Sequence, residues 1–161
     1  MTEVTIYTDG SSLGNPGAGG YGIVLMSGHH RKELSQGYSL TTNNRMELTA
    51  VCVALEALKN PEGCSVTLYT DSKYVTEAVN QHWVFGWEKK GFAKKKNPDL
   101  WMRFLRIYRR IGRDFASSPA IRFVWVKGHA SNMENNRCDQ LAVAAANGAD
   151  LIPDTGYSPE E

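Results

Sequence analysis

Two acidic residues in this sequence end matching segments and could bind a cation together. Tyr7-Thr8-Asp9 and Tyr69-Thr70-Asp71 repeat one triplet, and each follows an alternating, β-branched run that is typical of a strand. In open α/β sheets, ligands bind beyond the carboxyl ends of the parallel strands. If the two strands are neighbours, Asp9 and Asp71 lie about 5 Å apart, which is the spacing of adjacent strands. Two ionised carboxylates at that distance repel each other, so unless one of them is protonated, a cation between them would relieve the repulsion.

Glu47 and Asp139 are two further candidates for the same chemistry. Glu47 lies in line with Val51, Ala54 and Leu58 at helical spacing, near the face that should pack on the sheet, where an acid needs a partner. Asp139 lies near the start of the last predicted helix. Four carboxylates without a His/Cys cluster favour a hard cation, Mg²⁺ or Mn²⁺. Two such ions would stabilise the entering and leaving oxygens of a phosphodiester displacement.

Each of the four acids also has a purely structural interpretation. Asp71 could cap the helix that follows it, and Asp9 could be a turn residue. Glu47 could complete a capping box with Asn44 as the N-cap. Asp139 could be a first-turn acid that the helix dipole favours. The residues alone leave these alternatives open, although the matched pair is harder to dismiss than a single acid.

The elements that must position these acids follow from hydrophobic periodicity. Strands are predicted at 4–8, 21–27, 32–39, 66–70 and 121–126, and helices at 41–59, 72–80, 99–114 and 132–147, with a short piece at 83–87. This order predicts an α/β fold with one mixed five-stranded sheet and helices on both faces. The first three strands should be antiparallel and the last two parallel to the first. We expect one domain over 1–149 and a poorly ordered tail over 150–161.

The glycine-rich segment 17–22 satisfies GxGxxG but lacks the context of a dinucleotide-binding loop. It lies eight residues beyond the first predicted strand and leads into another strand, whereas the motif should open a helix. We interpret these glycines as turn residues that let the backbone come close to another group.

Composition indicates one globular domain. The chain has 161 residues, 42% of them hydrophobic and 22% charged, and no apolar run long enough to span a bilayer. Neither a secretion signal nor a membrane association is predicted, and we expect a cytoplasmic protein. Cys52, Cys64 and Cys138 are odd in number and far apart, which supports neither a zinc site nor a disulfide framework.

Charge is distributed unevenly along the chain. Residues 88–113 carry ten Lys and Arg against two acids, whereas the remainder carries eight against fifteen. Such a block suggests a polyanionic partner, although a solvated helix face would look the same. Its lysines are Lys89, Lys90, Lys94, Lys95 and Lys96, and a stripe of arginines follows at 103, 106, 110 and 113. Trp83 and Trp87 lie four residues apart and could form a ridge or pack in the core.

Several short motifs jointly resemble the type 1 ribonuclease H family. In the family's order they are Thr8–Ser11, Gly14–Gly17, Thr42–Leu48, Thr70–Ser72, Val126–His129 and Asn135–Asp139. The stretch 83–101 resembles the basic protrusion of the bacterial members. The resemblance implies hydrolysis of the RNA strand of RNA/DNA hybrids, which leaves 5′-phosphate and 3′-hydroxyl ends. It implies Asp9, Glu47, Asp71 and Asp139 as metal ligands, and a role for His129 in proton transfer or product release.

The resemblance also implies how a hybrid is bound. The wide, shallow minor groove of a hybrid offers 2′-hydroxyls on one strand only. The residues implied to contact the RNA strand or the DNA backbone are Gly10, Asn15, Thr42, Asn43, Asn44 and Glu47. Trp83 and Trp87 would contact deoxyribose, and the lysines would bind phosphates with little sequence specificity. Lys73 stands where many members carry glutamine, so a phosphate contact would replace a base contact; the loop 92–98 is also shorter than in familiar relatives.

Two other functions are compatible with this fold. One is a DNA nuclease or strand-transfer enzyme, against which the asparagine-rich Thr42–Arg45 stretch argues. The other is a non-catalytic hybrid-binding module, which would not require all four acids. We expect a monomer without an obligate protein partner.

Overall fold

The computed structural model of the chain describes residues 2–112, 120–128 and 132–159. The strands are β1 (Thr2–Ser12), β2 (Gly17–Ser27), β3 (His30–Thr41), β4 (Cys64–Thr70), β5 (Ile121–Trp125) and β6 (Leu151–Ile152). The α-helices are α1 (Asn43–Glu56), α2 (Lys73–Asn80), α3 (Trp83–Lys89), α4 (Pro98–Ile111) and α5 (Met133–Asn147), and Pro61–Gly63 forms a short 3₁₀ turn.

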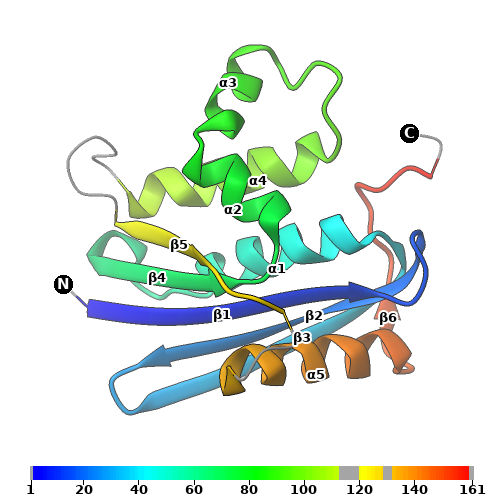
Figure 1. The fold of residues 1–161 in the computed structure, drawn as a ribbon, viewed down its shortest axis with the longest axis horizontal. Coiled ribbons are helices and arrows are strands. Elements are labelled where there is room, and N and C mark those ends of the chain that lie inside the picture. Colours follow the sequence, from blue (N-terminus) through cyan, green and yellow to red (C-terminus); the bar gives the residue numbers. More distant parts are fainter. Residues whose placement is uncertain (1, 113–119, 129–131, 160–161) are drawn as a thin grey trace.

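The strands form one mixed sheet in the order β5-β4-β1-β2-β3-β6. β1, β2 and β3 are antiparallel neighbours, and β4 and β5 run parallel to β1. Helices α1 to α4 lie on one side of the sheet and α5 lies on the other (Figure 1). The predicted α/β class, the orientation of the first five strands and the covering of both faces are therefore confirmed.

The sixth strand corrects the expected five-stranded sheet and the expected poorly ordered tail. β6 pairs parallel with β3, with Gly37 opposite Leu151. Beyond it, Asp154 accepts hydrogen bonds of 2.7 Å from Arg45 Nε and from the Thr41 hydroxyl. Arg45 is only 2% exposed, and a buried guanidinium requires carboxylate partners. The tail supplies one of these partners, so residues 150–159 belong to the folded domain.

The glycines of β2 allow α5 to pack closely on the sheet. The structure extends β1 to Ser12 and begins β2 at Gly17, so the turn is shorter than the sequence predicts. A Cβ atom at Gly20 would lie 2.6 Å from the carbonyl oxygen of Ala142, and one at Gly22 would overlap the carbonyl of Cys138. The interpretation of these glycines as turn residues is wrong, because residues 17–22 lie within β2, but the close backbone approach that they allow is present at Gly20 and Gly22.

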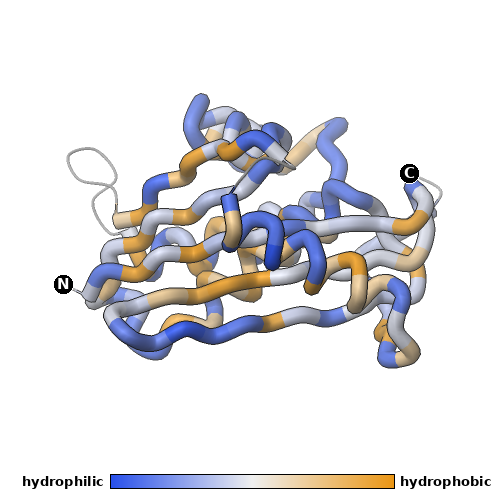
Figure 2. Tube along the Cα trace, turned by 60° about the horizontal axis from the view of Figure 1, so that its bottom comes forward, coloured by the Kyte–Doolittle hydropathy of each residue, from blue (hydrophilic) through white to orange (hydrophobic). Residues whose placement is uncertain are grey.

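The main core lies between the sheet and α1, α2 and α4. Its fully buried side chains include Ile6, Ile23, Leu68, Trp101 and Phe104. Hydrophobic stretches lie along several of the strands, whereas the turns are mostly hydrophilic (Figure 2). The predicted apolar face of α4 is buried, because this helix packs across α1. All three cysteines are free and buried, and no described helix is long and apolar enough to cross a membrane.

Candidate active site

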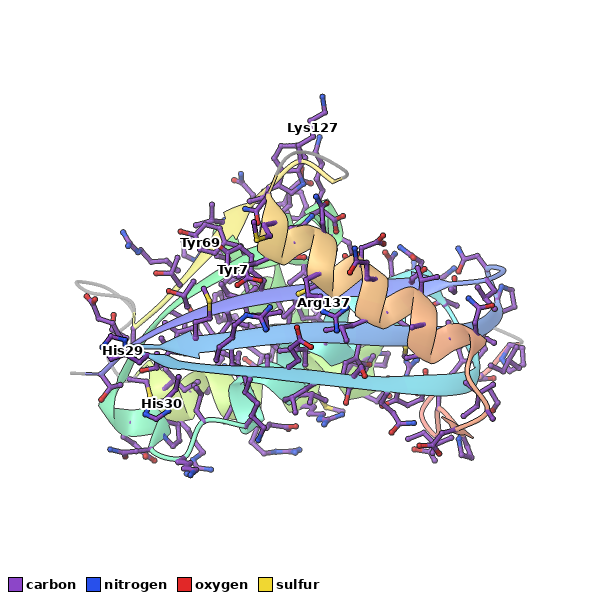
Figure 3. The ribbon with its side chains drawn as sticks, turned by 90° about the horizontal axis from the view of Figure 1, so that it is seen from below. Tyr7, His29, His30, Tyr69, Lys127 and Arg137 are labelled. Atoms are coloured by element: carbon purple, nitrogen blue, oxygen red, sulfur yellow. The ribbon has the colours of Figure 1, made fainter. Side chains whose placement is uncertain are left out.

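The register of β1 and β4 brings the matched acids together. Tyr7 pairs with Tyr69 and Thr8 with Thr70, so Asp9 and Asp71 leave the sheet at the same level. The two tyrosine rings stack at 4.8 Å on the sheet face beside α5 (Figure 3). Carboxylate oxygens of Asp9, Asp71 and Glu47 all lie within 4.8 Å of one another. The repeated triplet therefore marks two neighbouring parallel strands, as the sequence predicts.

Glu47 belongs to this cluster and does not cap its own helix. The N-cap of α1 is Thr42, whose hydroxyl accepts a hydrogen bond from Arg45 N, so the alternative with Asn44 as the cap is wrong. The backbone N–H of Gly10 donates to Glu47 Oε1 and also lies 3.0 Å from Asp9 Oδ1. A Cβ atom at Gly10 would collide with the backbone of α1, so glycine is required for this approach.

The structural alternatives for Asp71 and Asp139 are also wrong. Ser72 caps α2 by accepting a hydrogen bond from Val75 N, which leaves the Asp71 carboxylate free of that task. Asp139 lies beyond the first turn of α5, where the acidic residue is Glu134. The neighbouring Cys138 Sγ lies 3.2 Å from the carbonyl oxygen of Tyr7, which holds α5 against β1.

The four acids line one cavity of about 400 Å³. Asp139 contributes to its wall but lies outside the tighter group of three. The other lining residues are Gly10, Ser11, Asn43, Asn44, Ser72, Lys73 and Tyr74. The predicted convergence is therefore found, with three carboxylates at mutual ligand distance and the fourth beside them.

Burial and mutual repulsion make this cluster electrostatically unfavourable without a cation. Burial raises the pKa of Asp9 well above its ordinary value, and the nearby charge of Glu47 raises it further. Burial also raises the pKa of Glu47, although the Gly10 N–H opposes that shift. None of the ion pairs formed by the described residues involves these acids. Hard oxygen donors with uncompensated charge fit a divalent cation.

The predicted substrate contacts flank this cavity. Asn43 and Asn44 line it directly, and Asn15 accepts a hydrogen bond of 3.1 Å from Asn43 N. Asn15, Thr42 and Asn44 also line a second cavity of about 300 Å³, together with Lys96. These neighbours place the predicted asparagine contacts next to the acids.

The basic protrusion and the arginine stripe of α4 differ from the sequence prediction. Trp83 is 48% exposed, but Trp87 packs edge-on against Trp101 at 5.8 Å, so the two do not form one exposed ridge. The lysines at 89, 90, 94, 95 and 96 are exposed. Arg103 and Arg110 form ion pairs with Glu56 and Glu62, which reduces the free positive charge. Arg113 and His129 lie outside the described residues.

Trp125 is a residue that the sequence interpretation missed. Its indole Nε1 donates a hydrogen bond of 3.0 Å to the carbonyl oxygen of Asp71. The only sequence signal is its place near the end of the strand predicted at 121–126, which should run parallel to the one that precedes Asp71.

Comparisons with known proteins agree with this geometry. The family model described as RNase H matches residues 1–147. A "Ribonuclease H" of Syntrophus aciditrophicus (strain SB) is 54% identical, with 96% of this chain and 87% of that protein covered. One of Aeromonas hydrophila is 48% identical, with 99% of each covered. Among solved structures, LC9-RNase H1 matches with a TM-score of 0.74 and 28% identity, covering 98% of this chain and 79% of its own. LC11-RNase H1, solved in complex with an RNA/DNA hybrid, matches with a TM-score of 0.64 and 27% identity over 89% and 96%.

Proposed function

This chain belongs to the ribonuclease H family, and on that premise we propose that it hydrolyses the RNA strand of RNA/DNA hybrids at the carboxylate cavity. Asp9, Glu47, Asp71 and Asp139 would hold two divalent cations, Mg²⁺ or Mn²⁺. The observation that carries the proposal is the group of three carboxylates whose oxygens lie within 4.8 Å of one another. The cleavage would leave 5′-phosphate and 3′-hydroxyl ends.

The residues of the chain prepare this site before substrate arrives. When bound, the cations would supply Lewis acids that stabilise the entering and leaving oxygens of the displaced phosphodiester. The Gly10 N–H fixes the Glu47 carboxylate next to Asp9. Ser72 caps α2, so the Asp71 carboxylate stays available. We assign to His129 an assisting role in proton transfer or product release.

Substrate would lie across the cavity and the lysines of the protrusion. Gly10, Asn43, Asn44 and Glu47 would face the RNA strand, where Glu47 can also accept a hydrogen bond from a 2′-hydroxyl. Asn15 and Thr42 would seat the DNA backbone. The exposed Trp83 would contact deoxyribose, and the exposed lysines would bind phosphates, which carry no sequence information. We propose a monomer in a reducing, cytoplasmic compartment, in agreement with three free buried cysteines.

Cleavage of three duplexes by the wild type and by Asp9→Asn tests this function. We expect the wild type with Mg²⁺ to cut the hybrid in preference to duplex DNA or RNA, and EDTA to stop the reaction. Asp9→Asn should lower the cleavage rate by about 10³-fold or more, because one member of a cooperating cluster is removed. Hybrid binding by Asp9→Asn should change little, and Asp150→Asn, an exposed acid outside the cavity, should cleave normally.

Each contrary result selects another function or another site. Preferential cutting of DNA would indicate a DNA nuclease or strand-transfer enzyme on the same fold. Tight binding of the hybrid without cleavage by the wild type would indicate a binding module. Persistent cleavage by Asp9→Asn would contradict the assignment of the catalytic carboxylates.

A further inference from the structure

Lys73 and Trp125 meet at the rim of the carboxylate cavity. Lys73 is the first residue of α2 and lines the cavity with Asp71. Its Nζ atom lies 5.0 Å from the centre of the Trp125 ring. Trp125 ends β5 in register with Thr70, and its indole N–H donates to the Asp71 carbonyl oxygen. The indole is therefore fixed by the residue whose carboxylate belongs to the cluster, and its face holds a cation.

The polypeptide after Trp125 also approaches that carboxylate. The backbone of Val126 donates a hydrogen bond of 2.9 Å to the Thr70 carbonyl oxygen. A Cβ atom at Gly128 would lie 2.7 Å from Asp71 Oδ2. Trp125 and the residues that follow it thus enclose Asp71 from the side of β5, and a displaced indole would change the surroundings of a cluster carboxylate.

A lysine in this place would compete with a bound metal ion. An ammonium group on a flexible four-carbon stem, two residues from Asp71, is attracted by three clustered carboxylates. If it entered the cluster, it would neutralise part of the charge that a divalent cation requires. Among the described residues, however, Lys73 forms no ion pair with any acid. Its ammonium lies over the Trp125 ring instead.

We propose that Trp125 is a positioning residue that holds the Lys73 ammonium outside the carboxylate cluster. The cluster then keeps its negative charge for divalent cations, and the ammonium stays at the cavity rim for a phosphate of the nucleic acid. This inference rests on the proposed function for the identity of cation and substrate. An exposed cation–π contact shifts the balance between two lysine positions by about 2- to 5-fold, and that range is the upper limit of the effect on metal affinity.

Binding of Mn²⁺ to the protein without nucleic acid, measured by calorimetry, tests the proposal. Trp125→Leu removes the cation-binding ring and should raise the Kd for Mn²⁺ by at most about 2- to 5-fold. The double variant Lys73→Met with Trp125→Leu should restore the wild-type Kd, because no ammonium remains to enter the cluster. Trp125→Phe keeps a ring but cannot donate to the Asp71 carbonyl, and its Kd should stay close to that of the wild type.

The control is Trp83→Leu, which removes a similarly exposed indole that no cation–π contact joins to Lys73; its Kd for Mn²⁺ should not change. An unchanged Kd in Trp125→Leu would overturn the proposal. A raised Kd in Trp125→Leu that the added Lys73→Met does not restore would also overturn it. So would an equally raised Kd in Trp125→Phe, because the loss of the indole N–H would then be the cause. If the wild type itself bound no Mn²⁺, the proposed function would fail first, so the two failures are distinguishable.

Discussion

Asp9 and Glu47 are the residues at which function opposes stability. They are 5% and 4% exposed, and burial and nearby charge raise both pKa values above the ordinary 3.8 and 4.5. The folded protein therefore binds more protons at this site than the unfolded chain does. The resulting stability is fully present below the ordinary pKa values and declines as the pH rises through the raised ones.

We expect the metal-free protein to be less stable at about pH 8 than at about pH 5, because the unfolded chain ionises these carboxyls near their ordinary pKa values while the folded site still holds protons. Asp9→Asn should increase the free energy of unfolding at the higher pH by about 1–2 kcal/mol, since the unfolded chain no longer gains free energy by ionising this carboxyl. Urea denaturation in EDTA measures both effects. Asp150→Asn should show the wild-type pH dependence. A decrease of stability in Asp9→Asn at the higher pH would contradict this account.

At the level of elements, the packing of α5 on β2 places the fourth acid. Gly20 and Gly22 leave room for the backbone of α5, and the Cys138 thiol contacts the Tyr7 carbonyl. Asp139 follows Cys138 directly, so the distance between helix and sheet determines how far this carboxylate reaches toward the cluster. Figure 3 shows α5, which carries Arg137, lying across this face of the sheet.

Gly22→Ala should therefore destabilise the protein, because its Cβ would overlap the Cys138 carbonyl. Overpacking of this kind costs about 1–3 kcal/mol, and the shift of α5 should also lower cleavage activity. The matched control is Gly86→Ala in α3, where an added Cβ meets nothing within 4 Å and improves helix propensity. Urea midpoints of the two variants should move in opposite directions. A Gly22→Ala protein as stable as the wild type would show that α5 can move freely.

Across the whole molecule, positive charge gathers on one projecting part. The helix α3 and the loop after it project from the body beyond α2 and α4 (Figure 1). Arg103, Arg109 and Arg110 each form an ion pair with a glutamate, so their charges are partly compensated within the fold. The exposed lysines of the loop therefore carry the charge that is available to a nucleic acid.

Alanine at Lys94, Lys95 and Lys96 should raise KM and lower kcat little, because binding to phosphates contributes affinity and not chemistry. The slope of log KM against log salt should fall by about one for each phosphate that the variant no longer binds. The control replaces Lys32, Lys59 and Arg122 by alanine, which removes the same charge from exposed positions outside the carboxylate cavity. Steady-state kinetics at several salt concentrations compares the two. Equal effects would show that net charge alone matters.

The sequence by itself determined the fold class and the position of the matched acids. Repeated triplets at the ends of two strands predict the same level in a parallel sheet, and the register of Thr8 with Thr70 confirms it. The amphipathic period of α4 likewise predicts which of its side chains are buried. Both inferences succeed because periodicity and strand ends are local properties of the chain.

Only the tertiary structure decided the features that depend on contacts between distant segments. A two-residue strand such as β6 is too short to show a hydrophobic period in the sequence. The C-terminal tail is ordered because the buried Arg45 guanidinium requires the Asp154 carboxylate as a partner. From the sequence alone, Glu47 could equally have capped its own helix. The Gly10 N–H, which comes from a distant strand, places its carboxylate in the cluster. Trp125 contacts Asp71 across 54 residues of chain. Such contacts arise from packing in three dimensions, because side chains far apart in the sequence satisfy charges and hydrogen bonds that local patterns do not record.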